Sequence, residues 1–189
     1  MINTNLFNAT SICLTALDTE LDASTLARWT QDSRFIPLVE DESPPHPLSK
    51  AQAQKMLEEI LEESNEKRTT FWFGIRTLDR ETLLGIATLH WIDWSNGAVY
   101  MDITMKDFAE YGQDSTKEAL ELIQNYTFNE IQMHRLSITV PAYNEGLIET
   151  LQELGFNEEV RQREEIYRFG RRWDAIRFGV LASEWKKTD

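Results

Sequence analysis

The chain has 189 residues, of which 41% are hydrophobic, so it is long enough for one domain with a substantial core. Its formal net charge of −13 repels nucleic acid and anionic lipid, and we expect neither as a partner. The acidity attracts cationic ligands or simply keeps the protein soluble. No apolar run could cross a bilayer, and the N-terminal residues show no secretory signal. The only cysteine, Cys13, fits a reducing compartment, so we expect a single cytoplasmic domain over residues 1–189.

The first third of the chain predicts two helices. Asp22 is a good N-cap for the first helix, with Leu21 and Leu26 as a hydrophobic staple around the cap. Ser49 followed by Gln52 forms a capping box that predicts the start of the second helix. The apolar residues after this box recur at helical spacing, which indicates one buried face and one solvated acidic face.

The middle of the chain predicts a run of strands. Residues 69–77 alternate between apolar and polar side chains, and residues 83–94 form a long apolar segment. The sequence Ser-Asn-Gly at 95–97 is a hairpin turn, so we expect residues 98–105 to run antiparallel to the preceding strand.

The last part of the chain alternates between helix and strand. A helix opens at Asp114 or Ser115, a strand follows at 136–140, and Asn144 caps a further helix that ends at Gly155. Two final strands, at 158–169 and 173–182, are joined by a short turn. Antiparallel hairpins therefore flank one parallel crossover.

A polar loop joins the strand at 98–105 to the helix that follows it. Unpaired N–H groups at a helix start favour phosphate, so this layout suits an extended phosphorylated cofactor. Five short segments add to this pattern: Trp29 with Asp32, Gly85-Ile86, His134-Arg135-Leu136, Asn144 to Phe156 ending in Leu-Gly-Phe, and Gly170 to Asp174 followed by Glu184-Trp185. In this order and spacing they resemble the GNAT superfamily of N-acetyltransferases, and most of all its ribosomal-protein and spermidine acetyltransferase (RimJ/RimL-like) branch.

The resemblance implies an α+β fold in three α/β/α layers. Its centre is a twisted mixed sheet of about seven strands with helices on both faces, in which two parallel strands splay apart. Acetyl-CoA would enter the gap and contact the backbone of Ile103, Thr104 and Met105, with residues 136–140 across the gap. Asn144 would lie beside the thioester arm, although it also reads as an ordinary helix cap.

The cofactor loop departs from the family pattern. The family motif Gln/Arg-x-x-Gly-x-Gly/Ala falls on residues 111–116, and the positions expected to contact the pyrophosphate are Gly112, Gln113, Ser115 and Thr116. Asp114 and Thr116 replace the two motif glycines, and the backbone approaches phosphate less closely where a Cβ is present.

The charge of Asp114 matters more than its bulk. A carboxylate a few ångström from a phosphate costs roughly 2–4 kcal/mol, which weakens binding roughly 30- to 1000-fold. Lys106, Lys117 or a bound cation would offset part of this cost. An alternative is that Ser115 and Glu118 form a capping box, which satisfies the loop internally and closes it to ligand.

Amine acetylation needs a base because the acceptor ammonium must first lose a proton. We expect Asp93, Asp102 and His90 to face the cleft as candidates, although surface or sheet-packing roles stay open for each. The N–H of Met105 would polarise the thioester carbonyl. At Leu151, where many members of the superfamily have a tyrosine, no donor serves the leaving thiolate.

Trp91 and Trp94 are candidates to line a pocket for a cationic acceptor, although aromatic residues on a strand more often belong to the core. The three histidines show no metal-binding spacing, so no metal is expected.

The function expected from these residues is acetyl-CoA-dependent N-acetylation of a primary amine, either a small cationic molecule or a peptide N-terminus. The alternative is a GNAT-fold protein that no longer catalyses and serves as a binding or regulatory module. Whether the protein pairs with a second copy as a homodimer stays open.

Overall fold

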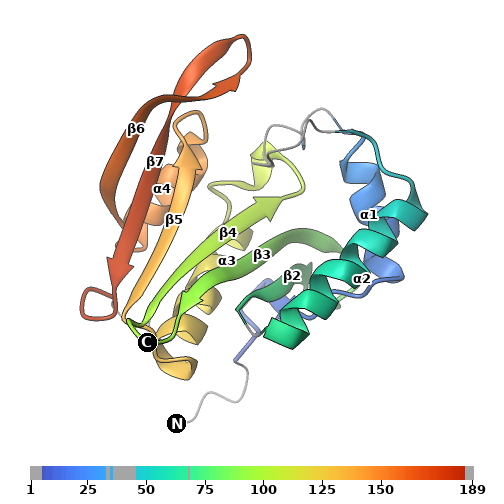
Figure 1. Cartoon of the computed structure of the whole chain (residues 1–189), viewed down its shortest axis with the longest axis horizontal. Helices are drawn as coiled ribbons and strands as arrows, with labels where there is room; N and C mark the ends of the chain where they lie inside the picture. The colour runs from blue at the N-terminus through green and yellow to red at the C-terminus, as the bar shows by residue number, and fades with distance from the viewer. Residues whose placement is uncertain (1–5, 33–34, 36–45, 68, 186–189) are drawn as a thin grey trace.

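The computed structural model describes residues 6–32, 35, 46–67 and 69–185. Their strands form one seven-stranded sheet in the order β1-β2-β3-β4-β5-β7-β6 (Figure 1). Only the neighbours β4 and β5 run parallel, and every other neighbouring pair is antiparallel. The strands are β1 (Ile12–Thr15), β2 (Phe71–Thr77), β3 (Leu83–Asp93), β4 (Ala98–Met105), β5 (Arg135–Pro141), β6 (Asn157–Arg168) and β7 (Arg171–Leu181).

Helices lie on both faces of the sheet, which confirms the predicted layered α+β fold. The helices α1 (Leu21–Trp29) and α2 (Lys50–Lys67) pack together and cover one face at the β2–β3 end. The helices α3 (Asp114–Asn125) and α4 (Glu145–Glu153) cover the opposite face (Figure 1). A short 3₁₀ turn, η2 (Phe108–Glu110), precedes α3, and a π-helical turn, η3 (Tyr126–Glu130), follows it. None of the helices in the described ranges is long and apolar enough to cross a membrane.

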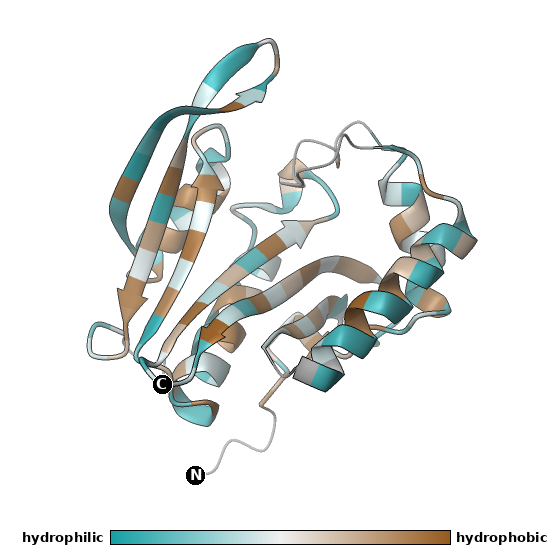
Figure 2. Cartoon of the chain, in the orientation of Figure 1, coloured by the Kyte–Doolittle hydropathy of each residue, from teal (hydrophilic) through white to brown (hydrophobic). Residues whose placement is uncertain are grey.

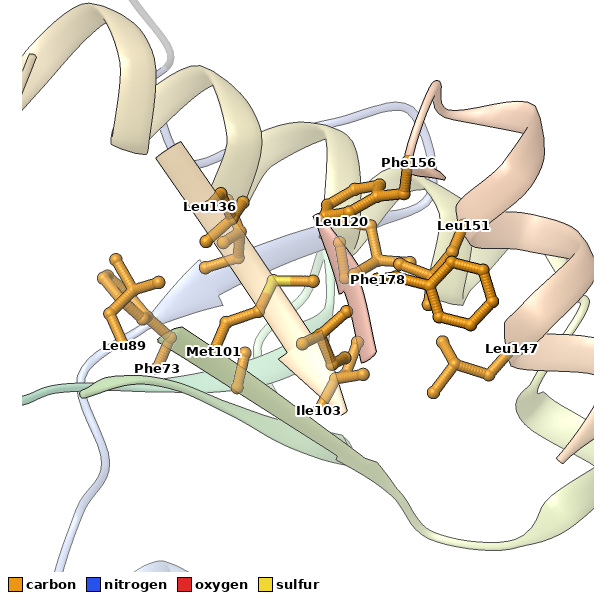
Figure 3. Packing of buried hydrophobic residues seen from close by; sticks show 14 of the residues in the cluster. Phe73, Leu89, Met101, Ile103, Leu120, Leu136, Leu147, Leu151, Phe156 and Phe178 are labelled. Carbon is orange, nitrogen blue, oxygen red and sulfur yellow. The ribbon is translucent and has the colours of Figure 1, made fainter. Parts of the chain in front are cut away.

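The main core lies between the sheet and the helices α3 and α4. Figure 3 shows side chains from β4, β5, β7, α3 and α4 that meet in this layer. Its fully buried members include Met101, Leu120, Leu136, Leu151 and Phe178. In contrast, the edge strand β6 is hydrophilic along most of its length and exposed (Figure 2). The buried side chains between the sheet and the helices fix α3 and α4 against the strands that carry the site.

Local capping confirms part of the sequence interpretation. The backbone N–H of Ser49 donates to Gln52 Oε1 at 2.9 Å and the backbone N–H of Gln52 donates to Ser49 Oγ at 3.3 Å, as a capping box requires. Asn144 caps α4, and the N–H of Phe156 returns to the carbonyl of Leu151 after Gly155, whose φ is +86°. These three contacts need only residues close in sequence, which is why they were predictable.

The predicted cap of α1 is wrong, although α1 begins at Leu21, one residue before the predicted start. Asp22 lies inside the first turn, 1% exposed, and its carboxylate accepts two hydrogen bonds from Arg76, at 2.5 and 2.7 Å. Asp18 receives the N–H groups of Glu20 and Leu21 instead. Leu21 is 74% exposed, so no hydrophobic staple forms around Asp22. The Asp22 carboxylate therefore binds Arg76 on β2, 54 positions away, and also accepts the N–H of Asp18 at 2.8 Å.

The parallel strands β4 and β5 separate after a short contact. Their pairing covers only residues 98–100 of β4 and 135–137 of β5. Beyond this point β5 stays paired with β7 as far as Pro141, while β4 stays with β3 as far as Met105. The two strands therefore diverge toward the top of Figure 1, which confirms the predicted splay.

Candidate active site

A cavity of about 430 Å³ opens where β4 and β5 diverge. Its walls come from both splayed strands, from the start of α4 and from β7. The lining residues are His90, Trp91, Tyr100, Met101, Asp102, Ile103, Thr104, Tyr111, Ile138, Thr139, Pro141, Tyr143, Asn144, Leu147 and Arg177.

The backbone of β4 presents alternate residues to this gap. Lys106 donates its N–H to the carbonyl of Leu84 on β3, so the even-numbered residues of β4 direct their backbone groups toward β3. The odd-numbered Ile103 and Met105 direct theirs toward the gap. Thr104 therefore lines the cavity with its side chain only, and its predicted role as a backbone contact is corrected.

Tyr111 occupies the open edge of β4. The N–H of Met105 donates to Tyr111 Oη at 3.2 Å, and the tyrosine hydroxyl donates to the carbonyl of Ile103 at 3.0 Å. The side chain is 6% exposed and lies where a pairing strand would otherwise lie. The two backbone groups predicted to receive the cofactor arm are thus already hydrogen-bonded.

Sequence reasoning missed this role of Tyr111. The available signal was its position, because an aromatic residue stands where the family motif has Gln or Arg. Gly146 on α4 allows the Tyr111 segment to pack closely against the helix, since a Cβ there would lie 2.8 Å from the carbonyl oxygen of Tyr111.

The side chains of the loop before α3 are bound within the loop. Thr116 is fully buried, and its hydroxyl donates to the carbonyl of Glu110 at 2.6 Å. Ser115 donates to the Glu110 carboxylate at 3.2 Å, and Lys106 pairs with the same carboxylate at 2.9 Å. Thr116 therefore cannot reach a ligand with its side chain, and Lys106 is not available to offset the charge of Asp114.

The alternative of a Ser115–Glu118 capping box is wrong. Glu118 instead accepts hydrogen bonds from the N–H and hydroxyl of Ser11 and from the N–H of Ile12, at 2.9, 2.8 and 3.2 Å. In the described part of the chain, the N–H groups of Asp114 and Ser115 have no hydrogen-bond acceptor. Gln113 takes the N-cap position without a side-chain bond, so the start of α3 keeps open donors.

Carboxylates surround these open donors. A second cavity of about 230 Å³ beside the loop is lined by Gly112, Gln113, Asp114, Lys117, Glu149, Thr150 and Glu153. Lys117 pairs with Glu153 at 2.9 Å, and this hydrogen bond holds the pKa of Lys117 above its ordinary value. The cation that was expected to offset Asp114 is therefore already paired, and the region keeps a surplus of negative charge.

Asn144 lies at the junction of the cavity and α4. Its side-chain oxygen accepts the N–H of Leu147 at 3.3 Å, and the residue is 5% exposed. Its amide also lines the cavity. The structure thus shows the capping role, and the position is also compatible with a contact to the thioester arm.

Of the candidate bases, Asp102 and His90 lie together in the cavity wall. His90 Nε2 is 3.0 Å from Asp102 Oδ2, although the two atoms do not form a hydrogen bond. Asp102 is exposed and His90 is half-buried. His90 on β3 lies opposite Tyr100 on β4. Asp102 is two residues further along β4, so its side chain lies on the same face of the sheet as those of Tyr100 and His90.

Asp93 is removed from the candidate bases. Its carboxylate accepts hydrogen bonds from Ser95 and Asn96 in the β3–β4 turn, outside the cavity wall. The hydrogen bond from the Asn96 side chain, followed by those from the backbone, lowers the pKa of Asp93. Trp94 also lies in this turn and does not line the cavity.

Trp91 contributes an exposed aromatic surface to the cavity mouth. It lies at a β-bulge with φ of +47°, a strained conformation that costs about 1–3 kcal/mol for a non-glycine residue. Its ring is 72% exposed and packs edge-on against Tyr100 and His90, at 5.5 and 4.8 Å between centroids. This arrangement keeps a large apolar face in solvent next to the candidate base.

Known proteins share this architecture. A probable acetyltransferase superposes with a TM-score of 0.78 at 20% identity, covering 94% of this chain and 96% of that one. The spermidine/spermine N-acetyltransferase SpeG of Vibrio cholerae, solved with manganese ions, gives a TM-score of 0.69 at 19% identity over 92% of this chain and 94% of its own. Both likenesses show the fold.

In sequence, a probable N-acetyltransferase of Bacillus subtilis, YjcK, is 31% identical over 100 residues. That match spans 52% of this chain and 54% of the relative, so it covers about half the length of the curated protein. The GNAT acetyltransferase domain model matches residues 11–157, which is well over half of the chain and contains both splayed strands. The chain therefore belongs to the GNAT acetyltransferase domain family.

Proposed function

We propose that the protein transfers an acetyl group from acetyl-CoA to a primary amine, which is either a small cationic molecule or a peptide N-terminus. The observation that carries this proposal is the cavity between β4 and β5, which lies in the family's domain and has a carboxylate and an imidazole in its wall. A channel that reaches the gap-facing backbone of β4 suits an extended thioester arm.

The likeness to the RimJ/RimL branch supports the choice of an amine acceptor, since the structural neighbours include spermidine N-acetyltransferases. We place the protein in the cytoplasm, which its single buried thiol, Cys13, supports. We propose no nucleic-acid or membrane partner, and pairing into a homodimer stays a prediction.

In the proposed reaction, the neutral amine attacks the thioester carbonyl. The acceptor ammonium first gives one proton to Asp102; as the resulting amine attacks, the C–N bond forms, the C–S bond breaks, and the second proton on the nitrogen passes to water. The thiolate must then gain a proton, and Leu151 is buried and apolar. Among the described residues, Tyr143 is a phenol in the cavity wall near the start of α4, and we assign it as the candidate donor.

Two observations favour a second candidate, a binding or regulatory module without catalysis. Tyr111 holds the backbone groups of β4 that the arm needs, and Asp114 stands with Glu149 and Glu153 beside the expected pyrophosphate position. Both features weaken cofactor binding without altering the fold.

Calorimetric titration with acetyl-CoA, together with a thiol-release assay on a panel of primary amines that includes spermidine, tests the proposal. Binding with release of CoA that depends on the amine supports a transferase. No heat of binding at millimolar acetyl-CoA supports the non-catalytic module.

The variant Asp114→Asn isolates the effect of the loop charge. It removes a carboxylate beside the open donors of α3 and should tighten acetyl-CoA binding by roughly 30-fold or more. Glu165→Gln, on the exposed β6 and outside both cavities, removes the same charge and should change little. An equal response of both variants would assign the effect to net charge and contradict the local account. Substitution of Thr116 is avoided because its hydroxyl is bonded inside the loop.

A further inference from the structure

Arg177 is the cationic side chain in the wall of the cavity. It lies on β7 opposite Thr139 of β5, and both side chains line the space between the splayed strands. Within the described part of the chain, its guanidinium makes no ion pair and no hydrogen bond, and its Nε is buried without a partner. Its described neighbour is the ring of Tyr100, 5.5 Å from Cζ.

Such a guanidinium is uncommon in a folded protein. Three other arginines in the described part of the chain form ion pairs: Arg76 with Asp22, Arg135 with Glu159, and Arg161 with Glu158 and Asp174. A buried donor without a partner is costly, and unpaired groups of this kind in native proteins mark positions where a ligand completes the bonding. The planar, forked guanidinium matches the geometry of a carboxylate.

The other side of the cavity has the opposite character. Asp102, with His90 beside it, lies on β4 and β3, whereas Arg177 lies on β7 across the gap. Trp91 and Tyr100 supply an aromatic surface next to the carboxylate. An ammonium suits the Asp102 side, an anion suits the Arg177 side, and an apolar group suits the rings.

We propose that Arg177 binds a carboxylate of the acceptor, so that the primary amine is a free amino acid with an apolar or aromatic side chain, in place of the small cationic molecule or peptide N-terminus proposed above. Acetylation of this amino acid rests on the proposed acetyl transfer, whereas binding of its carboxylate to Arg177 does not. The acceptor amine then lies toward Asp102, where its proton leaves, and the carboxylate fixes its orientation.

The binding step is tested without acetyl-CoA, by calorimetric titration with N-acetyl-L-phenylalanine and its neutral analogue N-acetyl-L-phenylalaninamide. A charged hydrogen bond contributes on the order of 1.5–3 kcal/mol, so the carboxylate form should bind roughly tenfold to 100-fold tighter. Arg177→Gln should abolish this preference. Arg171→Gln, on the same strand but stacked over Trp173 outside the cavity, should keep it.

Equal binding of the two probes, binding of neither, or a preference that survives in Arg177→Gln would overturn the inference. Arg177→Lys covers the case in which the glutamine variant fails to fold. It keeps the charge but loses the fork, so it should retain a reduced preference, and an unchanged preference would count against the site.

Turnover with acetyl-CoA separates this inference from the proposed function. L-phenylalanine should be acetylated with a higher kcat/KM than 2-phenylethylamine, which has the same ring and amine but no carboxylate. Acetylation of both with equal kcat/KM would keep the transferase and remove the carboxylate site. A carboxylate preference in binding without any turnover would keep the site and remove the transferase.

Discussion

Tyr111 links two parts of the site that are separate in sequence, the end of β4 and the cofactor loop. Its hydroxyl satisfies one donor and one acceptor of β4 while its ring packs in the core. A cofactor arm that binds the Met105 N–H and the Ile103 carbonyl must displace the Tyr111 hydroxyl. Without ligand, Tyr111 therefore blocks these two backbone groups.

Tyr111→Phe should therefore bind acetyl-CoA more tightly. The variant keeps the ring but frees the Met105 N–H and the Ile103 carbonyl, and two hydrogen bonds of about 0.5–1.5 kcal/mol each correspond to a roughly 5- to 100-fold gain. Calorimetric titration measures the change. Tyr143→Phe, which alters a second phenol in the same wall, should show no such gain, and unchanged affinity in Tyr111→Phe would contradict the competition.

Only some residues of the site could be predicted from the sequence. Asp102 and Asn144 were predicted in the cavity wall, and the structure places them there. Arg177 and Tyr111 were missed because their roles depend on contacts across strands and loops, which have no local pattern. Asp93 was predicted to face the cleft because it ends a strand. Its carboxylate instead accepts hydrogen bonds from Ser95 and Asn96 in the following turn, which the sequence alone does not reveal.

At the scale of elements, helix α1 is fastened to the sheet by the buried pair of Asp22 and Arg76. Arg76 also donates from Nε to the hydroxyl of Thr15 at 2.9 Å, so one side chain joins α1, β1 and β2. Both charged groups are almost fully buried, at 2% and 9% side-chain exposure.

Asp22→Ala should lower the free energy of unfolding by about 3–5 kcal/mol, because it leaves the Arg76 guanidinium buried without its partner. Urea denaturation followed by circular dichroism measures the loss. Glu59→Ala breaks an exposed pair with Lys55 on α2 and should change stability little. A small effect at Asp22 would show that water replaces the carboxylate.

The β3–β4 turn gives a pH-dependent prediction. Hydrogen bonds from Asn96 and Ser95 lower the pKa of Asp93 below its ordinary value of 3.8. A carboxyl whose folded pKa is depressed adds stability above the unfolded pKa, and this stability is lost as the pH falls through the folded pKa.

The difference in Tm between the wild type and Asp93→Asn should therefore be largest near neutral pH. It should shrink as the pH falls below about 4, where the carboxylate becomes protonated. Thermal melts at a series of pH values measure this difference. A difference that stays constant with pH would show that the charge of Asp93 does not support the turn.

Helices, strands and their local caps were more predictable than the side-chain contacts that join one element to another. The β3–β4 hairpin and the caps of α2 and α4 follow from residues within a few positions of each other. The roles of the Asp22 and Glu118 carboxylates depend on Arg76 and Ser11, which lie 54 and 107 positions away. Local propensity cannot report partners at that distance.

At the scale of the whole molecule, net charge opposes the proposed cosubstrate. Acetyl-CoA is a polyanion, the chain carries −13, and carboxylates outnumber cations beside the expected phosphate position. The fold itself followed from the order of helices and strands, whereas the local charge balance needed the observed pairing of Lys117 with Glu153.

Added salt should therefore strengthen acetyl-CoA binding. Screening shortens the reach of the repulsion, so the Kd should fall several-fold between about 20 and 300 mM sodium chloride. Titrations at matched pH in the two buffers measure the change. Binding that weakens with salt would show that cationic side chains dominate the encounter and would contradict the charge argument.

The hydrogen bonds that Glu118 accepts from Ser11 and Ile12 affect the order in which the chain can fold during synthesis. The strand β1 leaves the ribosome first, but the carboxylate that fastens its start is translated 107 residues later. The sheet partner of β1 is β2, which ends at Thr77, so β1 can join the sheet before Glu118 is made, and only the hydrogen bonds to its start form later. A pause in translation before codon 118 would therefore leave the start of β1 without these three hydrogen bonds for longer.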